Sequence, residues 1–87
     1  MPSVYALRMI YLALTAGGLQ QAIRSARAED AIWCGSDAIS EEAYAALEGV
    51  NLSRFNYALT DRSLVNGALL TIEEHHPGQV IWVESAA

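Results

Sequence analysis

The densest group of ionisable side chains is the run Glu73-Glu74-His75-His76. Carboxylates and imidazoles are ordinary zinc ligands, and a zinc site needs at least three of them converging on one point. The run belongs to a segment whose pattern is typical of a β-strand ending in a turn, and adjacent side chains of a strand point to opposite faces. The run therefore predicts a polar turn, and the sequence predicts no metal site.

Cys34 is the one thiol that could act as a nucleophile. It follows Trp33 in a short apolar run, and no histidine or acid is placed in the sequence to activate it, so we expect an inert core thiol. A single cysteine cannot close an internal disulfide, which favours a reducing compartment and a cytoplasmic protein. The sequence also lacks a phosphate-binding glycine loop, a nucleophile elbow and zinc-ligand spacing, so it predicts neither an enzyme nor a cofactor.

Composition limits the class of protein that these residues can serve. The 87 residues are 53% hydrophobic and 17% charged, which is enough for one packed domain over 1–87 and too apolar for a disordered chain. The net charge of -5 argues against a generic polyanion binder. The longest uncharged stretch, Met9–Ile23, is interrupted by glycines and glutamines and is shorter than a membrane-spanning helix, so no membrane association is expected.

The first half of the chain predicts two helices and one strand. Apolar residues recur at helical spacing over 4–16, around nearly the whole circumference of the expected helix. Gly17-Gly18 then predicts a hinge, after which 19–27 reads as an amphipathic helix. The short apolar run Ala31–Cys34 lies between Asp30 and Gly35 and predicts a buried strand.

The second half predicts two helices and a hairpin. Ser40 is placed to cap a helix that ends at Gly49, and Asn51 or Ser53 is placed to cap the next one. Asn66-Gly67 ends that helix. The β-rich runs 69–74 and 80–84 flank His76-Pro77-Gly78-Gln79, a good turn sequence, so we expect an antiparallel hairpin.

This order of elements resembles the winged helix-turn-helix superfamily over residues 19–84. The local match places a small residue, a turn glycine and apolar packing residues at Ala45, Gly49, Val50, Phe55 and Ala58. Glu48 departs from the pattern, because such motifs usually carry an apolar residue before the glycine. The resemblance implies an α+β winged-helix fold with an extra N-terminal helix, a recognition helix after Gly49 and a C-terminal hairpin wing.

The resemblance further implies a DNA-binding transcriptional regulator. Arginine and asparagine can each form two hydrogen bonds with a base, and hydroxyl groups can reach phosphate oxygens. The side chains expected to contact double-stranded DNA are Ser53, Arg54, Asn56, Tyr57, Thr60 and Arg62. The acidic hairpin tip counts against this function, because a wing that follows the phosphate backbone normally supplies lysine or arginine.

A second fold remains open. Phe55, Tyr57 and Leu59 also alternate, so 54–60 could be a strand joined through Asn66-Gly67 to a three-stranded antiparallel meander with helices on one face.

A second function remains open as well. The chain could be an acidic protein-interaction module, such as an inhibitor, immunity or adaptor protein, that docks on a basic partner through Trp82 and the C-terminal hairpin. In either case the apolar helix over 4–16 has more apolar faces than one small domain can cover, which predicts a homodimer. The expected interface residues are Val4, Leu7, Tyr11, Leu14 and Trp82.

Overall fold

The chain alternates strands and helices. The structure is a computed structural model, and it describes residues 8–84. Its elements are β1 (Met9–Ala13), α1 (Ala16–Ser25), β2 (Ala31–Cys34), α2 (Glu41–Ala46), β3 (Leu52–Arg54), α3 (Arg62–His75) and β4 (Val80–Val83).

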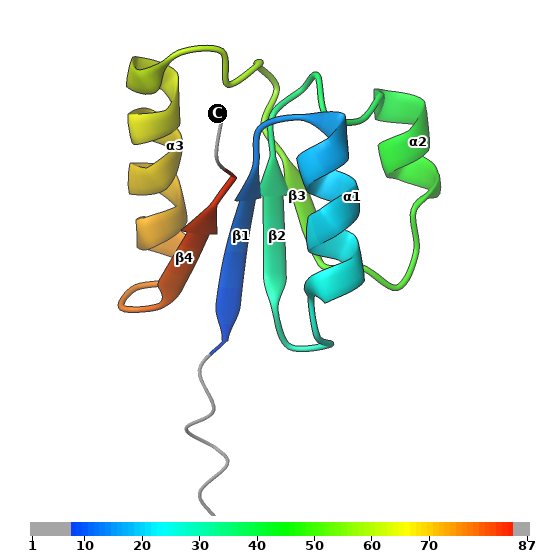
Figure 1. The fold of residues 1–87 in the computed structure, drawn as a ribbon, viewed down its shortest axis with the longest axis horizontal. Coiled ribbons are helices and arrows are strands. Elements are labelled where there is room, and N and C mark those ends of the chain that lie inside the picture. Colours follow the sequence, from blue (N-terminus) through cyan, green and yellow to red (C-terminus); the bar gives the residue numbers. More distant parts are fainter. Residues whose placement is uncertain (1–7, 85–87) are drawn as a thin grey trace, which may run out of the picture.

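All four strands belong to one sheet, in the order β3-β2-β1-β4, and every neighbouring pair is parallel. In Figure 1, α3 lies on one side of the strands, and α1 and α2 lie on the other. From β1 the chain moves outward to β2 and β3, and α3 then carries it back to the far side of β1. The strand order therefore reverses between β1 and β4.

The strand β1 corrects the expected helix over 4–16, which is wrong from Met9 onward. Ile10, Leu12 and Ala13 are fully buried. Ile10 and Leu12 join the core beneath α3, while Ala13 joins the core beneath α1. Side chains buried on both faces are typical of a central parallel strand covered by helices on each side. The same distribution of apolar residues led to the expectation of a helix.

The two glycines after β1 do not form a hinge. They lie inside the first turn of α1, and Thr15 caps this helix by accepting a hydrogen bond from the Gly18 amide at 3.1 Å. The amphipathic helix expected after the glycines is confirmed in part, since α1 buries Leu19 and Ala22 and ends at Ser25.

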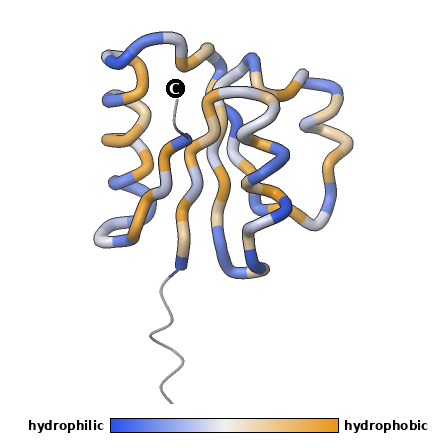
Figure 2. Tube along the Cα trace, viewed as in Figure 1, coloured by the Kyte–Doolittle hydropathy of each residue, from blue (hydrophilic) through white to orange (hydrophobic). Residues whose placement is uncertain are grey.

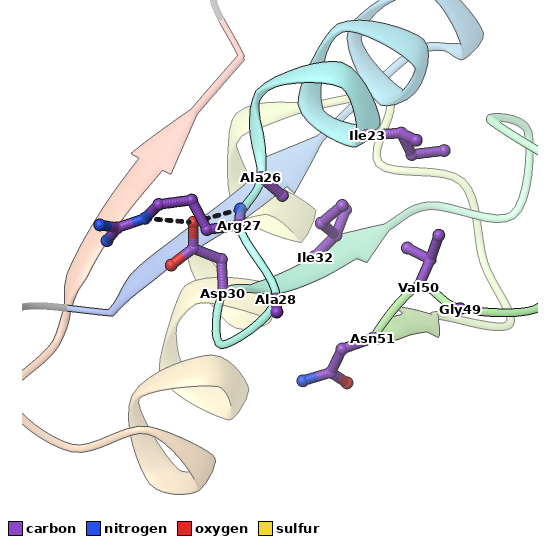
Figure 3. A pocket seen from close by; sticks show the side chains of 9 residues that line it. All are labelled: Ile23, Ala26, Arg27, Ala28, Asp30, Ile32, Gly49, Val50 and Asn51. Atoms are coloured by element: carbon purple, nitrogen blue, oxygen red, sulfur yellow. Dashed lines mark hydrogen bonds and ion pairs between the residues drawn. The ribbon is translucent and has the colours of Figure 1, made fainter.

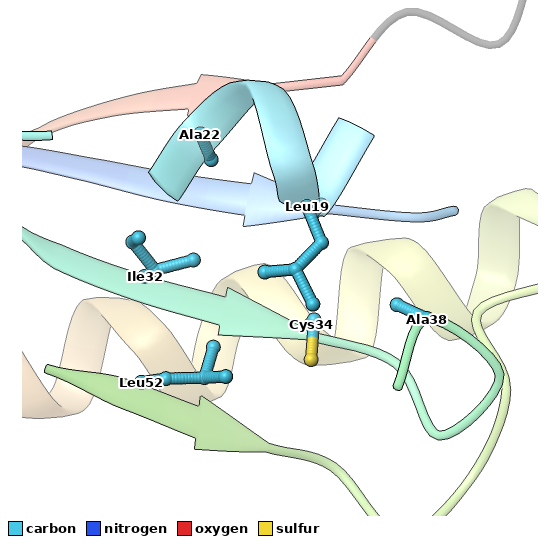
Figure 4. Close-up of a cluster of buried hydrophobic side chains, with 7 residues drawn as sticks. Leu19, Ala22, Ile32, Cys34, Ala38 and Leu52 are labelled. Atoms are coloured by element: carbon cyan, nitrogen blue, oxygen red, sulfur yellow. The ribbon is translucent and has the colours of Figure 1, made fainter. Parts of the chain in front are cut away.

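Two hydrophobic clusters fill the space between the sheet and its helices. Figure 2 shows hydrophobic residues along the strands and on the helices beside them. The cluster beneath α1 and α2, shown in Figure 4, consists of Ala13, Leu19, Ala22, Ile32, Cys34, Ala38 and Leu52. The cluster beneath α3 consists of Ile10, Leu12, Ala31, Leu59, Ala68 and Ile72.

The winged-helix fold is wrong. The expected recognition helix is replaced by the strand β3 and an irregular segment over 55–61. The expected stop at Asn66-Gly67 and the first hairpin strand over 69–74 both lie inside α3. β4 does not pair with a neighbouring segment of the chain: Ile81 is aligned with Ile10, and the two strands are parallel.

The meander is wrong for the same reason, since every strand pair is parallel and β3 ends at Arg54. Several local predictions are confirmed. Ala31–Cys34 is β2, Ser40 caps α2 through the Ala43 amide at 3.1 Å, and Val80–Val83 is a strand. α2 ends at Ala46, before the expected Gly49, which has a positive φ of 78° in the turn that follows.

Candidate ligand site at the carboxyl edge of the sheet

The carboxyl ends of β1 and β4 meet beside the beginning of α3. All strands are parallel, so their carboxyl ends lie at one edge of the sheet, the upper edge in Figure 1. The chain leaves β1 toward α1 on one face and enters α3 on the other face. Open parallel sheets characteristically bind ligands at this edge, in the crevice where the strand order reverses.

The carboxylate of Glu84 holds the loop that follows β1. Its Oε1 accepts hydrogen bonds from the Leu14 amide at 2.6 Å and from the Thr15 amide at 2.8 Å. Its Oε2 accepts a hydrogen bond from the Thr15 hydroxyl at 2.6 Å. The residue after β4 is therefore fixed against the residues after β1.

These hydrogen bonds also determine the charge of Glu84. Burial of the carboxyl group by itself would raise the pKa, but the hydrogen bonds from Thr15 and Leu14 outweigh it, so the pKa of Glu84 lies below its usual value. The side chain is therefore a carboxylate near neutral pH, with one oxygen lone pair of Oε2 left for a further donor.

Gly18 provides the space for this carboxylate. A Cβ atom built on Gly18 would overlap the carboxylate of Glu84, whereas one built on Gly17 would meet only the Thr15 hydroxyl at 3.9 Å. A side chain at Gly18 would therefore displace Glu84 from the loop.

A cleft of about 470 Å³ opens next to Glu84 on the side of α3. Its apolar wall consists of Leu14, Leu59, Val65 and Val83, and its polar rim consists of Thr60, Asp61, Arg62 and Glu84. Binding sites for small molecules typically have this size and combine apolar walls with a few polar groups.

The charges at the rim differ in how firmly they are held. The Asp61 carboxylate caps α3 by accepting a hydrogen bond from the Leu64 amide at 2.9 Å. The exposed Arg62 guanidinium, in contrast, has no hydrogen-bond or ion-pair partner among residues 8–84. It is therefore free to pair with an anionic group placed in the cleft.

A smaller hollow of about 120 Å³ lies at the opposite, amino edge of the sheet (Figure 3). Its floor holds Asp30, whose carboxylate accepts hydrogen bonds from the Met9 amide at 2.9 Å and the Arg27 amide at 2.8 Å and faces the Arg27 guanidinium at 3.6 Å. Burial by itself would raise the pKa of Asp30, but these contacts outweigh it and keep the pKa below its usual value. This carboxylate fastens β1 to the loop before β2, so we assign it a structural role.

Arg54, expected to read bases, is turned into the protein. Its Nε donates to the Ile39 carbonyl at 2.8 Å and its terminal nitrogen donates to the Ser36 carbonyl at 2.9 Å. The side chain is only 13% exposed, and its remaining contact is Glu41 at 3.9 Å. Arg54 therefore fixes the loop between β2 and α2.

The other expected DNA contacts are spread over three elements. Ser53 is half-buried in β3, while Asn56 and Tyr57 are exposed in the segment after it. The ring of Tyr57 packs on Phe55, with centroids 5.3 Å apart. Thr60 and Arg62 alone come together, at the rim of the cleft.

The expected interface residues also separate. Val4 and Leu7 lie outside the described residues. Tyr11 and Trp82 are neighbours across the pair β1–β4, with ring centroids 5.7 Å apart, and Leu14 instead lines the cleft.

Glu84 and Gly18 were missed by sequence reasoning. The signal that could have found Gly18 is a five-residue apolar run followed by a capping threonine and paired glycines, which is typical of a strand leading into a helix. No local signal marks Glu84, because its partners precede it by 69 and 70 residues.

Within residues 8–84, no group of three or more His, Cys, Asp or Glu side chains is placed to hold a metal ion. No helix in that part of the chain has the length and apolar character needed to cross a membrane. Comparison with protein-family models, with curated proteins and with solved structures finds no match to this chain.

Proposed function

We propose that this protein binds a small molecule with an apolar body and one anionic group in the carboxyl-edge cleft. The observation that carries the proposal is the coincidence of the 470 Å³ cleft with the point where the strand order reverses. The hollow at the amino edge has about a quarter of this volume and a floor already occupied by the paired Asp30.

The chemistry of the ligand follows from the lining. Four aliphatic side chains form the wall and favour an apolar body. Arg62 supplies the one cation of the rim, and guanidinium groups bind carboxylates, sulfonates and phosphates with paired hydrogen bonds. Glu84 keeps its charge and accepts a hydrogen bond from a donor group of the ligand.

Two earlier hypotheses stay predictions with less support. DNA binding has less support because no helix forms where the recognition helix was expected. In addition, Arg54, expected to contact bases, donates hydrogen bonds to two backbone carbonyls of the protein. The acidic interaction module has less support because the hairpin expected to dock on the partner does not form, and β4 pairs with β1 instead.

Anilinonaphthalene sulfonate, which joins apolar rings to one anionic group, is a suitable probe. In a titration of the full chain followed by backbone amide resonances, we expect shifts at Leu14, Thr15 and 60–65. Val65→Trp should weaken these shifts, because the indole ring occupies part of the cleft. Arg62→Gln should weaken binding about tenfold, a loss of about 1.4 kcal/mol.

Arg24→Gln is the matched control, because Arg24 is an exposed arginine on α1, away from the cleft. It removes the same charge and should leave binding unchanged. Equal losses of probe affinity in the two arginine variants would show that the net charge of the protein, and not a contact with Arg62, causes the effect. Shifts confined to Tyr11, Gln21 and Trp82, or no shifts at millimolar probe, would overturn the proposal.

A further inference from the structure

The strand β4 forms an unprotected edge of the sheet. It has β1 on one side and no strand on the other among residues 8–84. Its sequence, Val-Ile-Trp-Val, contains no charge and no proline. Exposed edge strands are normally protected by such residues, because their free amide and carbonyl groups pair readily with another strand.

The pairing with β1 determines which backbone groups of β4 are free. Glu84 donates its amide to the Leu12 carbonyl at 2.9 Å. In a parallel ladder alternate residues face the same neighbour, so Trp82 and Val80 also direct their backbone groups toward β1. The amides and carbonyls of Ile81 and Val83 therefore point away from the sheet.

The face of β4 on the side of α1 is apolar and incompletely covered. α1 packs on β1 and β2 (Figure 1). Val80 is 47% exposed, and Trp82 is half-buried against Tyr11. A hollow of about 210 Å³ beside them is lined by Met9, Tyr11, Gln21, Ala22, Ser25 and Trp82, none of which is charged.

We propose that β4 pairs in antiparallel fashion with β4 of a second copy of this chain. A twofold axis at Trp82 places Ile81 opposite Val83 of the other copy and Val83 opposite its Ile81. Each of these two pairs exchanges both an amide and a carbonyl, so all four outward groups of each strand are satisfied. The two four-stranded sheets become one continuous sheet.

The same register explains the apolar face. Trp82 lies opposite Trp82 of the other copy, as a pair without hydrogen bonds in which the side chains approach most closely. The two indole rings and the two Tyr11 rings then form one aromatic row across the axis. A second copy carries the same net charge of -5, and this uncharged surface is where two such chains can meet without placing like charges together.

A cysteine scan tests the register directly. Trp82→Cys places two thiols across the axis, at a spacing that a disulfide spans, so mild oxidation should yield a covalent dimer on a non-reducing gel. Val80→Cys is the matched control: its two copies are separated by about four residues along the strands, or ~13 Å, and should not cross-link. The buried Cys34 stays out of reach in both variants.

The mass of the unmodified chain completes the test. Sedimentation should give twice 9.4 kDa for the parent protein. Trp82→Lys should give a monomer, because it places two ammonium groups directly opposite each other across the axis. Leu70→Lys should remain dimeric, because Leu70 is a 70% exposed side chain on α3. A parent protein that is monomeric at several hundred micromolar, cross-linking of Val80→Cys, or a dimer unaffected by Trp82→Lys would each overturn the proposal.

Discussion

Cys34 illustrates how burial determines the chemistry of one residue. The thiol is fully buried beneath α1, and desolvation raises its pKa to about 11. We expect native protein at pH 8 to resist an aromatic disulfide reagent, while protein unfolded in urea reacts within minutes. Rapid stoichiometric labelling of the native chain, without loss of its circular dichroism, would contradict this assignment.

Among residues 8–84, Asp30 is the one charged residue that is buried. Asp30→Ala removes the carboxylate that accepts partly buried hydrogen bonds from the Met9 and Arg27 amides, and the loss of such an acceptor costs about 1–3 kcal/mol. Urea denaturation should report a decrease in the unfolding free energy of this order. Glu29→Ala, one residue earlier and fully at the surface, should change it by less than about 0.5 kcal/mol.

The paired glycines of α1 should give opposite results when substituted. Gly18→Ala should destabilise the protein, because the added methyl group displaces the Glu84 carboxylate and leaves the Leu14 and Thr15 amides unpaired. Gly17→Ala should be neutral or stabilising by up to about 1 kcal/mol, since alanine favours helix and its Cβ meets only the Thr15 hydroxyl, at an ordinary contact distance of 3.9 Å. Thermal unfolding of the two variants should show a lower midpoint temperature for Gly18→Ala alone. Equal changes in the midpoint temperature of both variants would exclude a special role for Gly18.

Sequence patterns correctly predicted those elements that depend on residues only a few positions apart in the chain. The capping hydroxyl of Ser40 and the four-residue run Ala31–Cys34 are of this kind. The pairing of strands is not local: β1 has apolar residues all round because helices cover both faces of the sheet, and this burial on both faces imitates a helix in the sequence.

Three residues of the candidate site were predicted as functional, each in a different role: Thr60 and Arg62 as DNA contacts and Leu14 as a dimer contact. The segment 55–61 carries aromatic and apolar residues that fit a helix or a strand equally well, although it forms neither. The cleft forms because α3 returns the chain to the far side of β1. This connection between distant segments cannot be predicted from the residues of any one segment.

The unfolding free energy should depend on pH in two steps. The half-buried imidazole of His76 accepts a hydrogen bond from the Trp33 indole at 3.3 Å, and partial burial, His75 and Arg8 hold its pKa below 6.5. The unfolded chain therefore takes up this proton first. The unfolding free energy should decrease as the pH falls below about 6.5, and His76→Gln should remove this step.

The second step belongs to the carboxylates. Asp30 and Glu84 have pKa values below 3.8 and 4.5 in the fold, so their stabilisation is complete above those values and is lost as the pH falls through the lower, folded-state values. Urea titrations from pH 8 to pH 3 should resolve both decreases. A stability that rises on acidification would contradict the hydrogen bonding described for all three groups.

The contact between Glu84 and the loop after β1 has a consequence for synthesis of the chain. A ribosome makes Leu14 and Thr15 first, and the carboxylate that holds them follows 70 and 69 residues later. Until then the growing chain has β1 without its β4 neighbour, and the apolar side chains on that flank stay accessible to chaperones. The four-stranded sheet of residues 8–84 can therefore form completely only after β4 and Glu84 have emerged from the exit tunnel.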